Sequence, residues 1–232
     1  MTPTGAVVLR PEPGNAATAA RLTALGIAVR RCPLFAVGQV DWMPPDPGRY
    51  DALMLTSANA VRHAGPGLRA LGGLPVLAVG AATAMAARDA GLTVAITGDR
   101  DAAALVEQAR ARGFIRLLSL AGRDRVPADV DAVTVYASEP LPIDAATVQG
   151  WEGQVALLHS ARAARRFAAL VDEGGLPRRD IGVAALSAAV AESAGEGWAA
   201  LSVADRPEDG ALVDAVAALI DPCGPPTDKR GR

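Results

Sequence analysis

Aromatic side chains are scarce in this chain: they make up 3% of its 232 residues, whereas half of the residues are apolar. Its hydrophobic cores must therefore be built mainly from Ala, Val and Leu. There are only two cysteines, Cys32 and Cys223, which lie far apart and have no metal-ligand spacing around them. This pattern favours a reduced, cytoplasmic protein rather than a disulfide-stabilised or zinc-binding one.

Long apolar segments are also missing. No apolar run approaches the ~18 residues that a membrane span needs. The N-terminus enters an apolar strand at Ala6 without the basic and apolar regions of a signal peptide. We therefore expect neither export nor membrane insertion.

The net charge is −2, which argues against a dedicated nucleic-acid binder. Every cationic side chain except Lys229 is an arginine. Two interpretations of this bias stay open. It can reflect the codon usage of a GC-rich genome, or some guanidinium groups can bind substrate carboxylates through paired hydrogen bonds.

Familiar catalytic motifs are absent as well. The sequence contains no P-loop, no GxGxxG after the first strand, and no HExxH, CxxC or GxSxG. His63 and His159 have no Cys, His or carboxylate at metal-binding spacing. We expect neither a metal nor a cofactor, and an enzyme of this kind would act through shape, hydrogen bonds and one weak acid.

The stretch Tyr50 to Val61 is the most informative local pattern. Its apolar run stops at Thr56 and Ser57, which predicts a buried strand of a parallel sheet that leads into a helix capped by Ser57 or Asn59. We expect that helix to continue to about Leu71. The pattern predicts a strand end at which hydroxyl groups and helix N–H groups gather.

A second copy of this pattern follows about a hundred residues later. Ser57 to Ser160 is an offset of 103, and both Thr83 to Ser187 and Gly91 to Gly195 are offsets of 104. A nearly constant offset predicts two copies of one α/β unit. Ligands of open parallel sheets bind beyond the carboxyl ends of the strands, where these hydroxyls lie.

Each candidate residue also has a structural interpretation. Ser57, Thr83, Ser160 and Ser187 are expected to cap helices, and a capped helix N-terminus can in addition bind an anion. Tyr136 ends an apolar strand, where such a side chain often only packs with its hydroxyl bonded. The residues alone leave both interpretations open.

Several short segments are more specific together, in their order and spacing, than any one of them. They are Leu9-Arg10-Pro11-Glu12-Pro13, Leu25-Gly26-Ile27-Ala28-Val29, Cys32-Pro33-Leu34-Phe35, Asp51 to Val61, Ala78-Val79-Gly80-Ala81-Ala82-Thr83-Ala84, Leu120-Ala121-Gly122-Arg123 and Val133-Thr134-Val135-Tyr136. This set resembles the uroporphyrinogen-III synthase family over nearly the whole chain.

The resemblance implies a fold of two flavodoxin-like, doubly wound parallel-sheet α/β domains joined by a two-stranded linker. Residues 1–34 and 140–220 would form domain 1, and 38–136 would form the inserted domain 2. The linker segments would be 35–37 and 137–139. The tail, 221–232, is rich in Pro and Gly and is expected to be disordered.

The resemblance also implies a cofactor-free reaction. Hydroxymethylbilane loses its terminal hydroxyl as water, ring D is inverted, and the macrocycle closes to uroporphyrinogen III. Tyr136 matches the family position proposed to donate a proton to the leaving oxygen. The substrate carboxylates would be held by the remaining candidates, which are Arg10, Thr56, Ser57, Asn59, Thr83, Arg123, Ser160 and Ser187. The expected partner is thus a polycarboxylate small molecule, bound by a monomer that binds no nucleic acid and no membrane.

The sequence departs from the family pattern at three places. The Gly-x-x-Thr of the C-terminal domain is Ala184-Ala185-Leu186-Ser187, the Thr-Ser pair is His159-Ser160, and the segment from Arg125 to Val133 is shorter than the family's helix. Two alternatives therefore stay open beside the synthase. One is a non-catalytic two-domain protein that binds another anionic small molecule, and the other is a degenerate synthase homologue.

Overall fold

The computed structural model describes residues 3–125 and 129–220, so the tail expected to be disordered lies outside the described residues. Strands and helices alternate along the chain, and the core strands of both sheets are parallel. The predicted α/β class with parallel sheets is confirmed. None of the helices in the described part of the chain is long and apolar enough to span a membrane.

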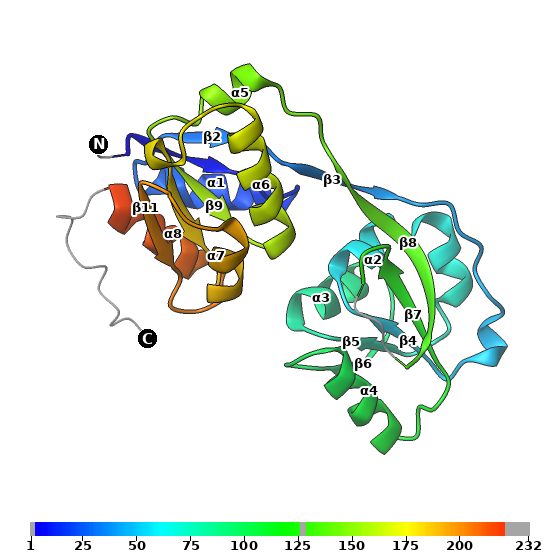
Figure 1. The fold of residues 1–232 in the computed structure, drawn as a ribbon. Helices are drawn as coiled ribbons and strands as arrows, with labels where there is room; N and C mark the ends of the chain where they lie inside the picture. The colour runs from blue at the N-terminus through cyan, green and yellow to red at the C-terminus, as the bar shows by residue number, and fades with distance from the viewer. Residues whose placement is uncertain (1–2, 126–128, 221–232) are drawn as a thin grey trace. The chain divides into compact units, whose positions relative to one another are not determined.

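The chain forms two compact units. Unit 1 contains residues 1–36 and 140–232, and unit 2 contains residues 37–139. The chain passes between them in strands β3 (Phe35–Gln39) and β8 (Asp131–Pro140), which are neighbours in one sheet (Figure 1). The linker segments expected from the sequence belong to these two strands.

Unit 1 is built on a five-stranded parallel sheet in the order β2-β1-β9-β10-β11. The strands are β1 (Gly5–Val8), β2 (Val29–Arg31), β9 (Gln154–Leu158), β10 (Gly182–Ala185) and β11 (Ala200–Val203). The helices are α1 (Gly14–Ala24), α5 (Ala145–Gln149), α6 (Ala161–Glu173), α7 (Ala188–Ala194) and α8 (Asp209–Ile220), with a 3₁₀ turn at Arg178–Asp180. In chain order this arrangement is 2-1-3-4-5, the flavodoxin-like doubly wound order.

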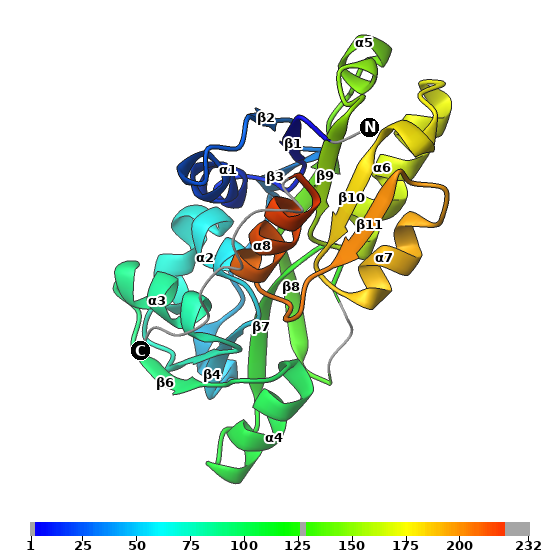
Figure 2. The same cartoon turned by 90° about the vertical axis from the view of Figure 1, so that its left-hand side faces the viewer.

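Helices cover both faces of the unit 1 sheet, which is why β1 and β10 are buried along their whole length. Helices α6 and α7 pack on one face, and α1 and α8 lie side by side on the other (Figures 1 and 2). The α6 face gathers several of the few aromatic residues: the ring centroid of Phe167 lies 5.4 Å from that of Trp151 and 5.1 Å from that of Trp198. The α1/α8 face is purely aliphatic.

Unit 2 has the order β8-β7-β4-β5-β6, with β3 added beside β8. The other strands are β4 (Ala52–Leu55), β5 (Val76–Ala78), β6 (Val94–Thr97) and β7 (Leu117–Gly122). The helices are α2 (Ala58–His63), α3 (Ala81–Asp89) and α4 (Ala102–Ala111), with 3₁₀ turns at Pro47–Arg49 and Gly65–Leu71. The helix expected to run to about Leu71 ends at His63, because Gly65 adopts φ +63° and is followed by Pro66.

The two units share one strand order when β4 is matched with β9, as the sequence repeat predicts. Strands β5 and β6 then match β10 and β11, while β7 and β8 match β1 and β2. The repeat is circularly permuted, since the first strand and helix of the chain complete the sheet of unit 1. One difference remains. Helix α1 connects β1 to β2, whereas the described residues between β7 and β8, 123–125 and 129–130, form no helix.

Candidate functional site

Unit 2 contains a cavity of about 1180 Å³, referred to below as the unit 2 cavity. Four of the residues singled out from the sequence line it: Thr56, Ser57, Arg123 and Tyr136. Thr56 and Ser57 follow strand β4, and Arg123 follows strand β7. Side chains far apart in the sequence therefore meet at the carboxyl ends of neighbouring strands, as expected for a parallel sheet.

Tyr136 lies on strand β8 at the edge of the cavity. Its ring packs against Gly122, where an added Cβ would lie 2.8 Å from the ring atoms Cε2 and Cζ and 3.0 Å from the hydroxyl. A glycine is required there because any side chain would displace the ring. A register shift between Ala121 and Gly122 places Gly122 beside Tyr136.

The Tyr136 hydroxyl forms no hydrogen bond within the described part of the chain. The nearest ring is that of His63 on helix α2, with centroids 6.3 Å apart. Burial and the neighbouring Arg62 charge lower the pKa of His63 and favour its neutral form. The phenol is therefore free to donate to a ligand in the unit 2 cavity.

Ser57 is the N-cap of helix α2: its backbone is extended and its Oγ accepts a hydrogen bond of 3.2 Å from the N–H of Asn59. Of the two capping alternatives left open, Ser57 is the one observed. Asn59 lies inside the helix, where its Oδ1 accepts from Arg62 at 3.3 Å. Because the Ser57 oxygen only accepts in this cap, its O–H remains free to donate to a ligand, as do its main-chain N–H and the Thr56 side chain.

The charges around the unit 2 cavity are mixed, with five carboxylates and three guanidinium groups. Arg110 pairs with Asp129 at 2.9 Å, and Asp101 caps helix α4 by accepting from the N–H of Ala104. Arg123 pairs with Glu139, but both side chains are more than half exposed. An exposed ion pair contributes little, so Arg123 can exchange this partner for a ligand carboxylate at small cost.

The remaining predicted caps give a mixed outcome. Ser160 caps helix α6, its Oγ accepting from the N–H of Ala163 at 3.2 Å. Ser187 holds the N-cap position of helix α7, but its side chain makes no capping hydrogen bond. The prediction for Thr83 was wrong: Gly80 is the N-cap of helix α3, and Thr83 is the third helical residue, 7% exposed.

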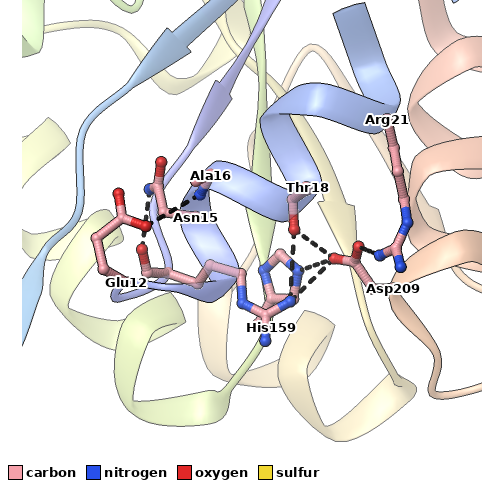
Figure 3. Close-up of polar contacts among 8 residues, drawn as sticks. Glu12, Asn15, Ala16, Thr18, Arg21, His159 and Asp209 are labelled. Atoms are coloured by element: carbon pink, nitrogen blue, oxygen red, sulfur yellow. Dashed lines mark hydrogen bonds and ion pairs between the residues drawn. The ribbon is translucent and has the colours of Figure 1, made fainter. Parts of the chain in front are cut away.

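Unit 1 contains a polar cluster that the sequence did not indicate. Asp209, in the first turn of helix α8, is 15% exposed and collects several donors (Figure 3). Its Oδ1 accepts from Thr18 at 2.6 Å and from Arg10 at 3.1 Å, and lies 2.8 Å from Nε2 of His159, while Oδ2 binds Arg21. We call these five residues the Asp209 cluster. It brings together residues that follow strands β1 and β9.

The loop that carries Arg10 is held by Asn15, which is fully buried in the first turn of helix α1. Its Nδ2 donates to the carbonyls of Val8 at 2.8 Å and Arg10 at 2.9 Å, and its Oδ1 accepts from Nε of Arg31 at 3.0 Å. The predicted site residue Arg10 is therefore positioned from both its main chain and its side chain.

Protonation in the Asp209 cluster follows from burial and hydrogen bonding. Burial would raise the pKa of Asp209, but the hydrogen bonds from His159, Thr18 and Arg21 outweigh it and hold the pKa below its usual range. Burial lowers the pKa of His159, and the nearby Arg10 charge acts in the same direction against the opposing effect of Asp209. Near neutral pH His159 is therefore neutral and donates from Nε2, and its buried Nδ1 has no partner within the described residues.

This arrangement predicts that stability falls as the solution is acidified below neutral pH. The folded state holds the pKa of His159 below its unfolded value of about 6.5, so the unfolded chain binds the extra proton first. Stability should be complete above that pH and decrease as the pH falls towards the folded pKa. Urea unfolding at pH 7, 6 and 5 should show this slope, and His159→Gln should reduce it. The variant His63→Gln is measured beside it, because the pKa of His63 is lowered too and this histidine can add to the pH dependence. If the pH dependence of stability were unchanged in His159→Gln, its attribution to His159 would be contradicted.

Metal-binding geometry is not found: within residues 3–125 and 129–220, no three His, Cys, Asp or Glu side chains gather in a way that could hold an ion. Cys32 is buried as a free thiol, and Cys223 lies outside the described residues.

Comparison with known proteins shows which family the chain belongs to. The model of the family "Uroporphyrinogen-III synthase HemD" matches residues 16–214. The fold is similar to that of uroporphyrinogen-III synthetase from Helicobacter pylori 26695, with a TM-score of 0.65, 16% identity, and coverage of 93% of this chain and 99% of the other. It is also similar to a mutant uroporphyrinogen III synthase from Thermus thermophilus, with a TM-score of 0.51, 15% identity, and coverage of 94% and 99%.

Among curated proteins none matches the sequence. Identities near 15% show a likeness of fold alone, whereas the family model rests on the sequence itself and covers most of it. The resemblance seen in the short motifs is thereby confirmed, and the chain belongs to the uroporphyrinogen-III synthase family.

Proposed function

We propose that the protein is a uroporphyrinogen-III synthase, a lyase that converts hydroxymethylbilane to uroporphyrinogen III with loss of water and inversion of ring D. Family membership over residues 16–214 supports this function. The structural observation that best supports this function is the position of Tyr136. It lines a large cavity together with Thr56 and Arg123, and its hydroxyl has no hydrogen-bond partner among the described residues. That combination supplies a weak acid and carboxylate-binding groups in one place.

Tyr136 would act at the leaving group. The bilane ends in a CH₂–OH group, and the C–O bond breaks more easily when the oxygen receives a proton and leaves as water. The phenol supplies that proton, and the pyrrole α-carbon that forms the new C–C bond later loses one, which restores the phenol. The electron-rich pyrrole carries the positive charge left behind. No redox partner is needed, because the reaction only removes water.

Selecting the isomer is the harder task. The bilane closes spontaneously without inversion to give type I product. For type III product, the cationic methylene bonds to the α-carbon of ring D that already carries the bridge to ring C, that bridge bond breaks, and the freed methylene bonds to the other α-carbon of ring D, which then loses its proton. The enzyme must hold the geometry in which ring D can pivot between these bonds. A rigid parallel sheet with binding groups at its strand ends suits that task, because the positions of the groups are fixed by the strands. The unit 2 cavity supplies such a rigid surface.

The substrate has eight carboxylates, and the other candidate residues are proposed to share them. Arg10 uses Nη1 for Asp209 and Thr18 and is about a third exposed, so its other N–H groups remain available. Ser160 and Ser57 use Oγ for capping, and the buried Thr83 hydroxyl is withdrawn from solvent. Thr83 would contribute through its main-chain N–H, and Ser57 and Ser160 through their main-chain N–H groups and the hydroxyl hydrogens that capping leaves free. Asn59, Arg123 and Ser187 would use side chains.

The finer features of this proposal are a cofactor-independent reaction and a monomeric, cytoplasmic enzyme. Support for cofactor independence is chemical, since the reaction needs only a proton for the leaving oxygen and the removal of one from the pyrrole α-carbon, and Tyr136 can serve for both. A free, buried Cys32 suits a reducing compartment. Sedimentation of the purified chain over a range of concentrations measures the oligomeric state.

The function is tested by coupling the purified protein to enzymatic production of hydroxymethylbilane, oxidising the products to porphyrins and separating the isomers. We expect type III product in large excess over type I. Reactions with no protein or with heat-denatured protein define the spontaneous yield of type I. Type I product alone would contradict the synthase proposal and favour the non-catalytic or degenerate alternatives.

A further inference from the structure

The two units differ in how one face of the sheet is covered. In unit 1 this face is covered by α1, through Ala19 and Leu22, and by α8, through Leu212 and Val216. In unit 2 helix α4 takes the place of α8, packing Leu105 and Val106 on the matching face. No described residue forms a counterpart of α1 (Figure 1). A strip of the unit 2 sheet is therefore left without a helix from the described part of the chain.

This strip lines the unit 2 cavity: Met54 and Ser119 are almost fully buried, and Ala132 is exposed. Met54, Ser119 and Ala132 are aligned across strands β4, β7 and β8 by the strand register, and all three line the cavity. Side chains at paired positions of a parallel sheet point to the same face. Since Ser119 and Ala132 are small, the strip has room above it. A flat aromatic ring is the kind of group that fits such a surface.

Ser119 gives the strip a polar feature. The residue is 3% exposed, and its hydroxyl forms no hydrogen bond within residues 3–125 and 129–220. A hydroxyl that lines a cavity without a protein partner is normally satisfied by water or a ligand. Because this hydroxyl belongs to a residue that lines a cavity, a bound molecule can satisfy it. The strip thus combines apolar side chains with one hydrogen-bond acceptor, Oγ of Ser119.

A pyrrole matches both properties, because it has a flat apolar ring and an N–H that only donates. Ser119 and Tyr136 both line the unit 2 cavity, and Ser119 lies three residues, about 10 Å of strand, before Gly122, which contacts the tyrosine ring. A bilane whose hydroxymethyl end reaches Tyr136 can therefore extend its terminal rings over this strip.

We propose that this strip seats a terminal pyrrole ring of the bilane during inversion, with the ring over Ala132 and its N–H donated to Oγ of Ser119. The proposal rests on the proposed synthase function. Ala132 then determines specificity, because its small side chain leaves the ring space to turn over, and Ser119 is a substrate-binding residue.

Three variants test the proposal in the isomer assay. Ala132→Leu fills the strip, and Ala132 is exposed, so folding should be unaffected. We expect type III formation to fall at least tenfold and the type I share of the product to rise. Ser119→Ala should lower type III formation two- to tenfold, the effect of losing one hydrogen bond. Ala95→Leu, at an exposed position of strand β6 that does not line the cavity, should stay within twofold of the wild type.

Melting temperatures equal to that of the wild type ensure that the changes in isomer ratio are not caused by unfolding. If Ala132→Leu and Ser119→Ala both retain the wild-type rate and isomer ratio, the strip does not seat the ring. If the wild type itself makes only type I product, the proposed function fails. The two failures are thus distinguished by the wild-type reaction.

Discussion

Replacing Tyr136 with phenylalanine is expected to slow formation of uroporphyrinogen III by about 100-fold, within the usual range for removal of a general acid. The change deletes a hydroxyl that has no partner in the described protein, so no internal hydrogen bond is lost. The ring that packs on Gly122 is retained. Binding and folding should therefore be preserved, and the loss should appear in kcat rather than in KM.

The matched control is Tyr50→Phe, which removes the only other tyrosine hydroxyl in the sequence. Tyr50 donates to Asp131 at 3.1 Å at an exposed position and does not line the unit 2 cavity. Its variant should keep a rate within about threefold of the wild type, as expected for loss of one exposed hydrogen bond. Equal rates for Tyr136→Phe and wild type would remove Tyr136 from the acid role.

Much of the fold could be predicted because local patterns and long-range packing agree in this chain. The apolar run Val155–Leu158 is followed by His159 and the cap residue Ser160, and the run is buried because helices cover both faces of the sheet. Helix α4 runs over Ala102–Ala111, and local signals mark both of its ends, since Asp101 caps it and Gly113 follows it at φ +86°. Caps and glycines are local signals that a sequence carries.

Thr83 shows where such local signals fail. A hydroxyl residue after an apolar run resembles a cap, but the extended backbone at Gly80 starts helix α3 earlier. Glycine also occurs at N-cap positions, and no hydrogen-bonding side chain marks it there. The threonine is then carried into the first turn and buried. Propensity alone could not decide between the two starting points.

The candidate site was predictable only in part, for a related reason. Thr56, Ser57, Arg123 and Tyr136 were chosen from separate motifs, and the parallel sheet brings them to one cavity. The importance of Ser119 could not be predicted. In the sequence it is one polar residue in an apolar strand. Its interpretation depends on the fact that the described residues between its own strand, β7, and strand β8 form no helix.

The abundance of arginine has a third explanation beside codon usage and ligand binding. Arg116 donates to Asp51 from Nε at 3.2 Å and from Nη2 at 2.7 Å, and this pairing lowers the pKa of Asp51 to about 2. Both of these bonds reach Oδ1 of Asp51, whereas Arg178 binds the two oxygens of Asp172 separately, from Nε to Oδ1 at 2.8 Å and from Nη2 to Oδ2 at 2.6 Å. A guanidinium can satisfy both oxygens of a carboxylate at once, which a lysine cannot. Part of the arginine content therefore joins segments of the fold.

The Asp209 cluster lay beyond sequence reasoning altogether, because Asp209 and Arg10 are 199 residues apart. Loss of the central carboxylate of this cluster is expected to have a large effect on stability. Asp209→Ala should lower the free energy of unfolding of unit 1 by about 3 kcal/mol, since removal of one partner leaves other buried polar groups unpaired. The low end of the usual range applies because Arg10 and Arg21 are partly exposed and can regain water.

Urea unfolding followed by tryptophan fluorescence measures this effect, with Trp151 and Trp198 reporting on unit 1. Trp42 belongs to unit 2 and is replaced by phenylalanine in all samples, so that the signal comes from unit 1 alone. Asp214→Ala, at an exposed position of the same helix, is the matched control and should change stability by less than about 0.5 kcal/mol. Asp209→Asn should lie between the two, because an amide oxygen still accepts hydrogen bonds but carries no charge for Arg10 and Arg21. If Asp209→Ala were as stable as the control, the cluster would contribute no net stability to unit 1.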